Sequence, residues 1–183
     1  SLDTDFEKIQ RNSLQECVDF VVNECTVLGG EGPNGEEDAL PIVYNNDNLG
    51  RVTRGAALAL KSRLLLYAAS DLWNTESWAQ GYSHPELIVL NKKDRKERWA
   101  EAAAAAKAVI DLSAQAGYEL MSRYTDLGKV YQSPELILVR RINGNTNTFE
   151  KLNFPAGFPN GEGRVTPSQN LVDAFPMSDG YPR

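Results

Sequence analysis

The chain has 183 residues, of which 42% are hydrophobic and 24% charged, a composition typical of a globular domain and not of a disordered or fibrous chain. With 19 Lys and Arg against 25 Asp and Glu, the formal charge is −6, which disfavours nucleic acid and anionic lipid as main partners. No apolar run approaches the roughly 18 residues that a membrane-spanning helix needs.

The first helix is predicted to begin at Thr4, where Thr4-Asp5-Phe6-Glu7 fits a capping box, and to end before Gly29 and Gly30. Apolar residues then recur at three- and four-residue steps and form one stripe: Phe6, Ile9, Cys17, Val18, Val21, Cys25 and Leu28. Eight residues of helix separate the two cysteines by roughly 12 Å. Because a disulfide tolerates at most about 7 Å between Cα atoms, we expect two buried free thiols.

Two more helices are predicted, one from Thr53 to about Ser70 and one from its Asp94 cap to Gly117. The former is apolar around most of its circumference, so we expect burial on more than one side. The latter contains five consecutive alanines, which favour helix and close packing. We expect 53–70 and 95–115 to be neighbouring antiparallel helices in a mostly α fold of tetratricopeptide-like stacked helix pairs, a plain bundle being the alternative.

The sequence changes character after Gly117. A short apolar run, Leu136–Arg140, predicts a strand, and 142–165 is rich in Asn, Gly and Pro. A short helix is predicted after a Thr166 cap and through Phe175. We therefore expect one unit over 1–183, with a helical part at about 3–117 and an irregular part at about 118–183.

Three short motifs are better explained as structure than as chemistry. Gly30–Gly35 matches G-x-G-x-x-G, but a helix precedes it and acidic residues follow, so a loop is predicted. Asn45–Asn48 resembles half a calcium loop and reads as a turn. His84 is the single histidine, so a histidine-based zinc site is excluded, no cofactor is expected, and no sequence feature places this histidine beside a nucleophile.

The segment from Asp71 to Lys93 is long for a connection between two helices, and such loops tend to be functional. It carries Trp73, Trp78 and Tyr82 among amide and hydroxyl side chains. One interpretation is an aromatic platform for a neutral, hydroxyl-rich ligand such as a sugar. The other is that Trp73 and Trp78 fold back and cap the helix pair, because aromatic side chains are mostly buried for their area.

Two segments carry a family resemblance. Residues 48–70 (NLGRVTRGAALALKSRLLLYAAS) resemble the signature helix of the SusD/RagB family, and 170–180 (NLVDAFPMSDG) resemble that family's second recurrent segment. Residues 99–112 and 133–141 fit the intervening pattern in order. The SusD/RagB proteins are nutrient-binding outer-membrane lipoproteins of Bacteroidetes.

The resemblance implies tetratricopeptide-like helix pairs, an outward-facing lipid anchor on the outer membrane and capture of glycan or peptide without catalysis. It also implies a partner, a SusC-like TonB-dependent transporter. The chain is shorter than the family's usual length and has no leader with a lipidated cysteine, so we expect an internal fragment whose ligand-binding region continues beyond Arg183. The resemblance assigns no binding residue.

Three functions remain open. A glycan-binding module predicts that Trp73, Trp78 and Tyr82 present their rings to solvent. A scaffold that docks a protein, with the ligand site elsewhere, would be favoured by an exposed Trp99 beside Tyr67. A glycan hydrolase needs two carboxyl groups about 5–10 Å apart in a cleft and is the least favoured.

Overall fold

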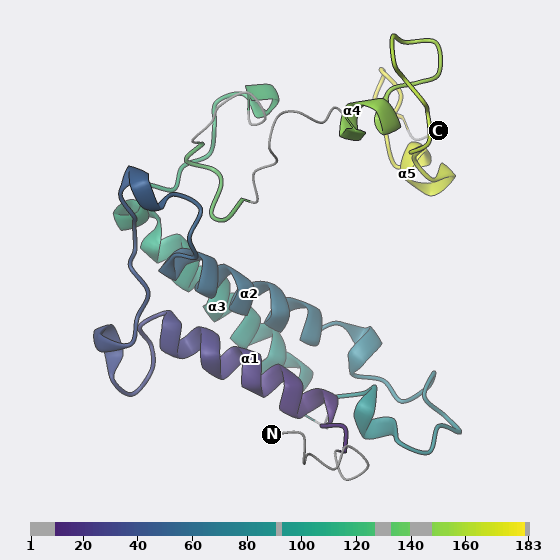
Figure 1. Cartoon of the computed structure of the whole chain (residues 1–183). Coiled ribbons are helices and arrows are strands. Elements are labelled where there is room, and N and C mark those ends of the chain that lie inside the picture. Colours follow the sequence, from purple (N-terminus) through teal and green to yellow (C-terminus); the bar gives the residue numbers. More distant parts are fainter. Residues whose placement is uncertain (1–9, 91–92, 127–132, 140–147, 182–183) are drawn as a thin grey trace, which may run out of the picture. The chain divides into compact units, whose positions relative to one another are not determined.

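The computed structural model describes residues 10–90, 93–126, 133–139 and 148–181. The fold is mostly α, as the sequence predicts, and its described helices are α1 (Leu14–Leu28), α2 (Arg54–Ala68), α3 (Arg95–Ala116), α4 (Thr148–Asn153) and α5 (Gln169–Asp173). The chain divides into two compact units, Ser1–Arg140 and Arg141–Arg183. The first unit contains α1, α2 and α3, which lie side by side (Figure 1).

Helices α2 and α3 are antiparallel neighbours, as predicted. Asp71, just after α2, forms an ion pair with Arg95 at the start of α3. At the other end, the hydroxyl groups of Thr53 and Tyr118 lie 3.4 Å apart. A Cβ added at Gly55 would lie 2.1 Å from the Tyr118 hydroxyl oxygen, so glycine allows this tyrosine ring to lie against α2.

The caps of α2 and α3 confirm the sequence prediction. The Thr53 hydroxyl accepts a hydrogen bond from the Ala56 amide, and the Asp94 carboxylate accepts one from the Glu97 amide. Gly117 ends α3 with a φ of 71°, a left-handed conformation that glycine adopts without the steric cost of a Cβ. Side chains at these positions thus satisfy backbone groups that a helix end leaves unpaired.

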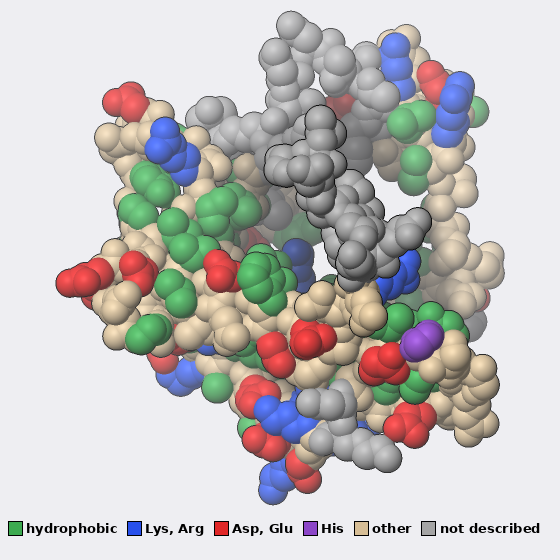
Figure 2. All heavy atoms as spheres, turned by 60° about the horizontal axis from the view of Figure 1, so that its bottom comes forward, with side chains coloured by type: hydrophobic (Ala, Val, Ile, Leu, Met, Phe, Trp, Pro, Cys, Tyr) green, Lys and Arg blue, Asp and Glu red, His purple; other side chains and the backbone are tan. Residues whose placement is uncertain are grey.

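The core of the first unit is thin and built from small side chains. Val18 of α1, Ala68 of α2 and Leu90 form its central cluster. Half of the remaining buried positions on α2 and α3 are alanines: Ala56, Ala57, Ala102 and Ala105. Many larger apolar side chains stay exposed, and hydrophobic groups (green) reach the surface in Figure 2. The small side chains allow the helices to approach closely.

The start of α1 differs from the prediction. The helix begins at Leu14 and residues 10–13 are not helical, whereas the Thr4 capping box lies outside the described residues. Ser13 is the cap: its hydroxyl accepts from the Glu16 amide at 3.2 Å, and the Glu16 carboxylate accepts from the Ser13 amide at 2.7 Å. This second S-x-x-E box directly precedes the part of α1 that packs against α2, and α1 begins there.

We predict that Ser13→Ala lowers the free energy of unfolding by about 1 kcal/mol, because the Glu16 amide loses its acceptor at a helix end. Ser13→Gly should lower it by only a few tenths of a kcal/mol, since water reaches the amide more easily. Urea denaturation followed by circular dichroism measures both values. Equal losses for the two variants would show that the hydroxyl does not cap α1.

The prediction that the two cysteines form no disulfide is correct. The prediction that both are buried is correct for Cys25 and wrong for Cys17. Both thiols are free; Cys25 is buried, and its burial raises the pKa of the thiol, whereas Cys17 is exposed. Because eight residues are not a whole number of helical turns, Cys17 and Cys25 do not lie on the same side of α1.

The Gly-rich segment after α1 forms a loop, as predicted, and Arg54 fastens it to α2. The Arg54 guanidinium donates to both carboxylate oxygens of Glu36, at 2.8 and 2.5 Å, and to the Leu40 carbonyl at 3.1 Å. Asn46–Asn48 is a single 3₁₀ turn, and the side-chain amide of Asn48 donates to the side-chain oxygen of Asn45 at 2.7 Å. These local contacts explain both short motifs, Gly30–Gly35 and Asn45–Asn48, as parts of loops and turns.

The hydrogen bonds from Arg54 lower the pKa of the Glu36 carboxyl below its ordinary value of 4.5. A depressed folded-state pKa means that the stabilising contact is present above the unfolded-state pKa and is lost as pH falls through the folded-state value. We predict that an NMR titration finds the Glu36 pKa below 4.5 and that Arg54→Met returns it to about that value. Arg51→Met is the control; if it had the same effect, the specific contact would be refuted.

The strand prediction for 136–140 is wrong. Residues 133–139 form turns, in which the Leu136 amide donates to the Ser133 carbonyl at 3.1 Å, and Arg140 lies outside the described residues. A strand needs a neighbour for its backbone groups. Within the described ranges, the single β-bridge joins Ala156 and Phe158, and no segment pairs with Leu136.

The described part of the second unit, residues 148–181, contains two short helices. The cap of α5 is Ser168, whose hydroxyl accepts from the Leu171 amide at 3.3 Å, and not Thr166 as predicted. Pro167 therefore lies before the cap instead of at the first helical position. The sequence did not predict α4, which lies in the Asn- and Gly-rich stretch.

Candidate functional site

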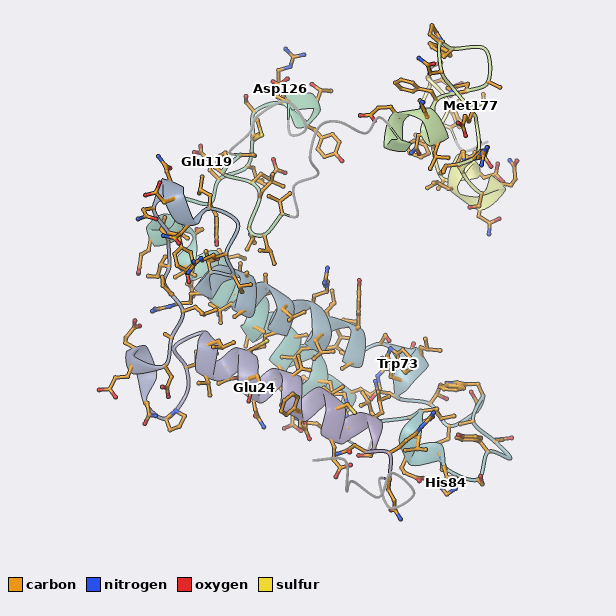
Figure 3. All side chains as sticks on the ribbon, in the orientation of Figure 1. Glu24, Trp73, His84, Glu119, Asp126 and Met177 are labelled. Carbon is orange, nitrogen blue, oxygen red and sulfur yellow. The ribbon has the colours of Figure 1, made fainter. Side chains whose placement is uncertain are left out.

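The aromatic loop, residues 71–90, leaves α2 through a 3₁₀ turn at Asp71–Trp73 and returns through another at Pro85–Leu87. Its two ends are joined, because the Leu90 amide donates to the Trp73 carbonyl at 2.9 Å. The loop lies at the end of the first unit where α1 begins, with Trp73 and His84 on that side (Figure 3). Its base is thus fixed to the helices.

Trp73 belongs to the core. The ring is half-buried and packs against the cluster of Val18, Ala68 and Leu90. Next to it, the Asn74 side-chain amide donates to the carbonyls of Ala68 and Ser70, both at 2.7 Å, and so satisfies acceptors at the end of α2. Of the three aromatic residues singled out from the sequence, Trp73 anchors the loop instead of presenting its ring to solvent.

Trp78 and Tyr82 are the exposed aromatic residues of the loop, with relative exposures of 45% and 46%. The Trp78 indole N–H donates to the Leu72 carbonyl at 2.7 Å, which holds one edge of the ring while much of its surface stays open. Between the two rings, Ala79 is buried, and its carbonyl accepts from the Tyr82 amide at 3.1 Å. The backbone that carries both rings is therefore held in place.

His84 and Glu86 extend the polar surface beside Tyr82. The Tyr82 and His84 rings meet edge to face, with centroids 6.4 Å apart, and His84 Nδ1 lies 3.2 Å from a Glu86 carboxylate oxygen. Sequence reasoning noted His84 without assigning it a place in a site. Pro85 is the sequence feature that could have indicated an ordered turn directly after His84, because proline favours the first position of a helical turn.

A groove of about 610 Å³ lies between the loop and the start of α1. Its apolar lining comes from Pro85, Val89 and Leu90. The polar lining comes from both elements and includes three carboxylates: Ser13, Gln15, Glu16, Glu76 and Glu86. The sequence did not predict this groove, because α1 and the loop are some 60 residues apart.

A second groove, of about 410 Å³, lies among α1, α2 and α3. Charged side chains of both signs line it, and they pair with one another: Lys61 with Glu31 at 2.6 Å, and Lys93 with Glu101. Arg98, only 5% exposed, donates to the Gln15 side chain at 3.2 Å. The Arg98–Gln15 contact joins α3 to α1, and the Lys61–Glu31 contact joins α2 to the segment after α1, so the charged lining of this groove is part of the helix packing.

Helices α2 and α3 also expose large apolar side chains. Leu60 and Tyr67 are seven residues apart on α2, and Trp99 and Ile110 are eleven apart on α3, so each pair lies on one stripe of its helix. Because Asp71 pairs with Arg95, Tyr67 and Trp99 each lie one turn inside the same end of the helix pair. Their exposures are 59% and 44%.

The described ranges contain no candidate metal cluster and no candidate membrane-spanning helix. There, no three His, Cys, Asp or Glu side chains are grouped so that they could hold a metal ion. None of the helices described has both the length and the apolar character for crossing a bilayer.

No protein-family model, curated protein or solved structure matches the chain. The resemblance of residues 48–70 and 170–180 to the SusD/RagB family thus stays a prediction from the sequence.

Proposed function

We propose that this chain captures a glycan without catalysis and passes it to a SusC-like TonB-dependent transporter. The observation that carries the proposal is the pair of half-exposed rings, Trp78 and Tyr82, on a loop whose base and centre are buried. A fixed backbone lets aromatic faces bind sugar rings without first losing loop entropy. Trp73 supports this surface from the core.

The expected affinity is modest. Each stacked ring contributes about 0.5–1.5 kcal/mol beyond the area that it buries. Two such contacts with neighbouring hydrogen bonds support a Kd between about 1 mM and 1 µM, which corresponds to about 4–8 kcal/mol. Weak, exchangeable binding suits a protein that releases its ligand to a transporter.

The SusD-like resemblance supplies the setting of the proposal. In the full-length protein, a lipid anchor would hold this chain on the outer face of the outer membrane, where it meets both polysaccharide and transporter. This part of the proposal rests on residues 48–70 and 170–180 alone.

Titration of intrinsic tryptophan fluorescence with neutral oligosaccharides tests the proposal. The panel is maltohexaose, xylohexaose, mannohexaose and cellohexaose. We expect a saturable change with at least one of them, because Trp78 is partly exposed and its emission depends on its surroundings. A flat response to the whole panel, confirmed by calorimetry, would contradict glycan capture by this chain.

A second candidate function is docking of a protein partner through α2 and α3. The exposed stripes with Tyr67 and Trp99 favour it, since apolar surface of this kind is typical of interaction sites. The partner that the resemblance indicates is the SusC-like transporter. In this alternative, the ligand site lies outside residues 1–183.

Co-purification with a SusC-like transporter tests docking through α2 and α3. Docking predicts that Tyr67→Ser/Trp99→Ser loses the complex while Trp78→Ala/Tyr82→Ala keeps it. The opposite pattern would refute docking through these helices.

A further inference from the structure

One tetrapeptide, Pro-Asn-Gly-Glu, occurs twice in the chain, at residues 33–36 and at residues 159–162. The first copy lies in the loop between α1 and α2, and the second lies between α4 and α5 (Figure 1). Asparagine is a chemically labile residue, above all before glycine, because glycine has no Cβ to shield its backbone nitrogen from the asparagine side chain. Since the two copies have the same local sequence, a difference in their reactivity must come from the fold.

Both copies form a β-turn with proline and asparagine at its centre. In each, the glycine amide donates to the carbonyl three residues earlier, at 3.0 Å in the first copy and 2.9 Å in the second. Asn34 has φ −93° and ψ 2°, the values of a type I turn. Asn160 has a φ of 63°, the positive value that a type II turn requires at this position. The same residues are therefore held in two backbone conformations.

The surroundings of the two glycines differ most. Among the described residues, no heavy atom lies within 4 Å of a Cβ built at Gly35. A Cβ built at Gly161 would lie 2.3 Å from the Pro155 carbonyl oxygen and 3.1 Å from that of Phe154. The amides of the next two residues donate to carbonyls in α4 and directly after it, at 2.7 and 2.9 Å. Gly161 is thus enclosed by backbone, whereas Gly35 has room to move.

Attack of a glycine nitrogen on the preceding asparagine side chain needs a local change of shape. The asparagine ψ must rotate, and the hydrogen bond of the turn must open. Such opening costs little where few contacts hold a segment and much where several do. In the first copy, the next hydrogen bonds along the chain, from the Glu37 and Ala39 amides, are both 3.3 Å long. The contact with Arg54 holds the side chain of Glu36 and not the backbone of Gly35.

We propose that Asn34 is a site of spontaneous deamidation and that the fold protects Asn160 from the same reaction. The Gly35 nitrogen attacks the side-chain carbonyl carbon, Cγ, of Asn34, and the new N–C bond closes a five-membered imide. The Cγ–Nδ2 bond breaks, and the Gly35 amide proton leaves with Nδ2 as ammonia. Water then opens the imide at either carbonyl, which leaves aspartate or isoaspartate at position 34.

The reaction changes the loop that Arg54 fastens to α2. The Asn34 side-chain amide donates to the Asp38 carboxylate at 2.7 Å, and the product replaces this donor by a second carboxylate. The new charge joins Glu36, Glu37 and Asp38 in one short segment. Deamidation therefore removes a hydrogen bond from the loop and adds repulsion between like charges.

Peptide mass mapping of the full chain, incubated at pH 8 and 37 °C, tests the proposal by following the deamidated fraction at each asparagine with time. We expect Asn34 to convert at least fivefold faster than Asn160 in the folded chain. In 8 M urea the two rates should agree within twofold, because the local sequences match and the turns are lost. The pair Asn143–Gly144 lies outside the described residues, and its peptide is quantified separately.

Asn34→Gln is the matched variant, since glutamine keeps the amide but has to close a six-membered ring, which is a much slower reaction. It should abolish conversion at position 34 and leave the rate at Asn160 unchanged. No conversion at Asn34, or a rate at Asn160 that equals or exceeds it in the folded chain, would overturn the proposal. A fivefold difference that persists in urea would also overturn it, because the fold would then not be its cause.

Discussion

Leu90→Ala is expected to lower the free energy of unfolding by about 2–4 kcal/mol, the usual cost of emptying a buried leucine site. Leu90 is 5% exposed and packs with Val18 and Ala68. Few large side chains are buried in this unit, so little else can fill the cavity. Urea denaturation of the full chain measures the loss.

The matched control is Leu72→Ala in the same loop. Leu72 is 55% exposed, so its substitution should change the free energy of unfolding by less than about 0.5 kcal/mol. Because the Leu90 side chain belongs to the cluster against which Trp73 packs at the base of the loop, Leu90→Ala should weaken glycan binding as well. Equal effects of the two substitutions would contradict the assignment of Leu90 to the core.

Trp78→Ala/Tyr82→Ala is expected to weaken oligosaccharide binding by more than tenfold, because two stacking contacts are lost together. Both side chains are about half exposed, so the circular dichroism spectrum and the urea midpoint should change little. Calorimetry with the best neutral hexasaccharide measures the loss.

Tyr67→Ala/Trp99→Ala is a control of identical composition, since it also removes one tyrosine and one tryptophan of similar exposure. It should leave Kd unchanged. If this pair abolished binding and the loop pair did not, the sugar would bind on α2 and α3, and the aromatic loop would be excluded as the site.

The sequence predicts a helix end correctly where a single capping residue coincides with the edge of an apolar pattern. Thr53, Asp94 and Gly117 each combine a capping residue with the edge of an apolar pattern, and the structure places helix ends at all three. At α1, two capping boxes occur nine residues apart in the sequence; Ser13 caps α1, and Thr4 lies outside the described residues. For Leu136, the composition favours a strand, but the described chain offers no pairing partner.

The candidate site shows the same limit. The length and aromatic content of residues 71–90 mark the loop, yet nothing local distinguishes Trp73 from Trp78. The difference in burial depends on a cluster that includes Val18, more than 50 residues earlier in the chain: Trp73 packs against this cluster, whereas Trp78 is 45% exposed. The carboxylate of Glu16 joins the groove for the same reason. Such contacts between distant segments are outside the reach of a single sequence.

The three tryptophans offer a direct test of where sugar binds, because each gives one indole N–H resonance in an NMR spectrum. Substitution of each tryptophan by phenylalanine assigns the signals. On addition of a neutral hexasaccharide, the Trp78 resonance should move most, since this indole is exposed and bonded to the Leu72 carbonyl. The Trp99 resonance should stay in place. Movement of Trp99 alone, or of no tryptophan at saturating sugar, would contradict glycan capture by the aromatic loop.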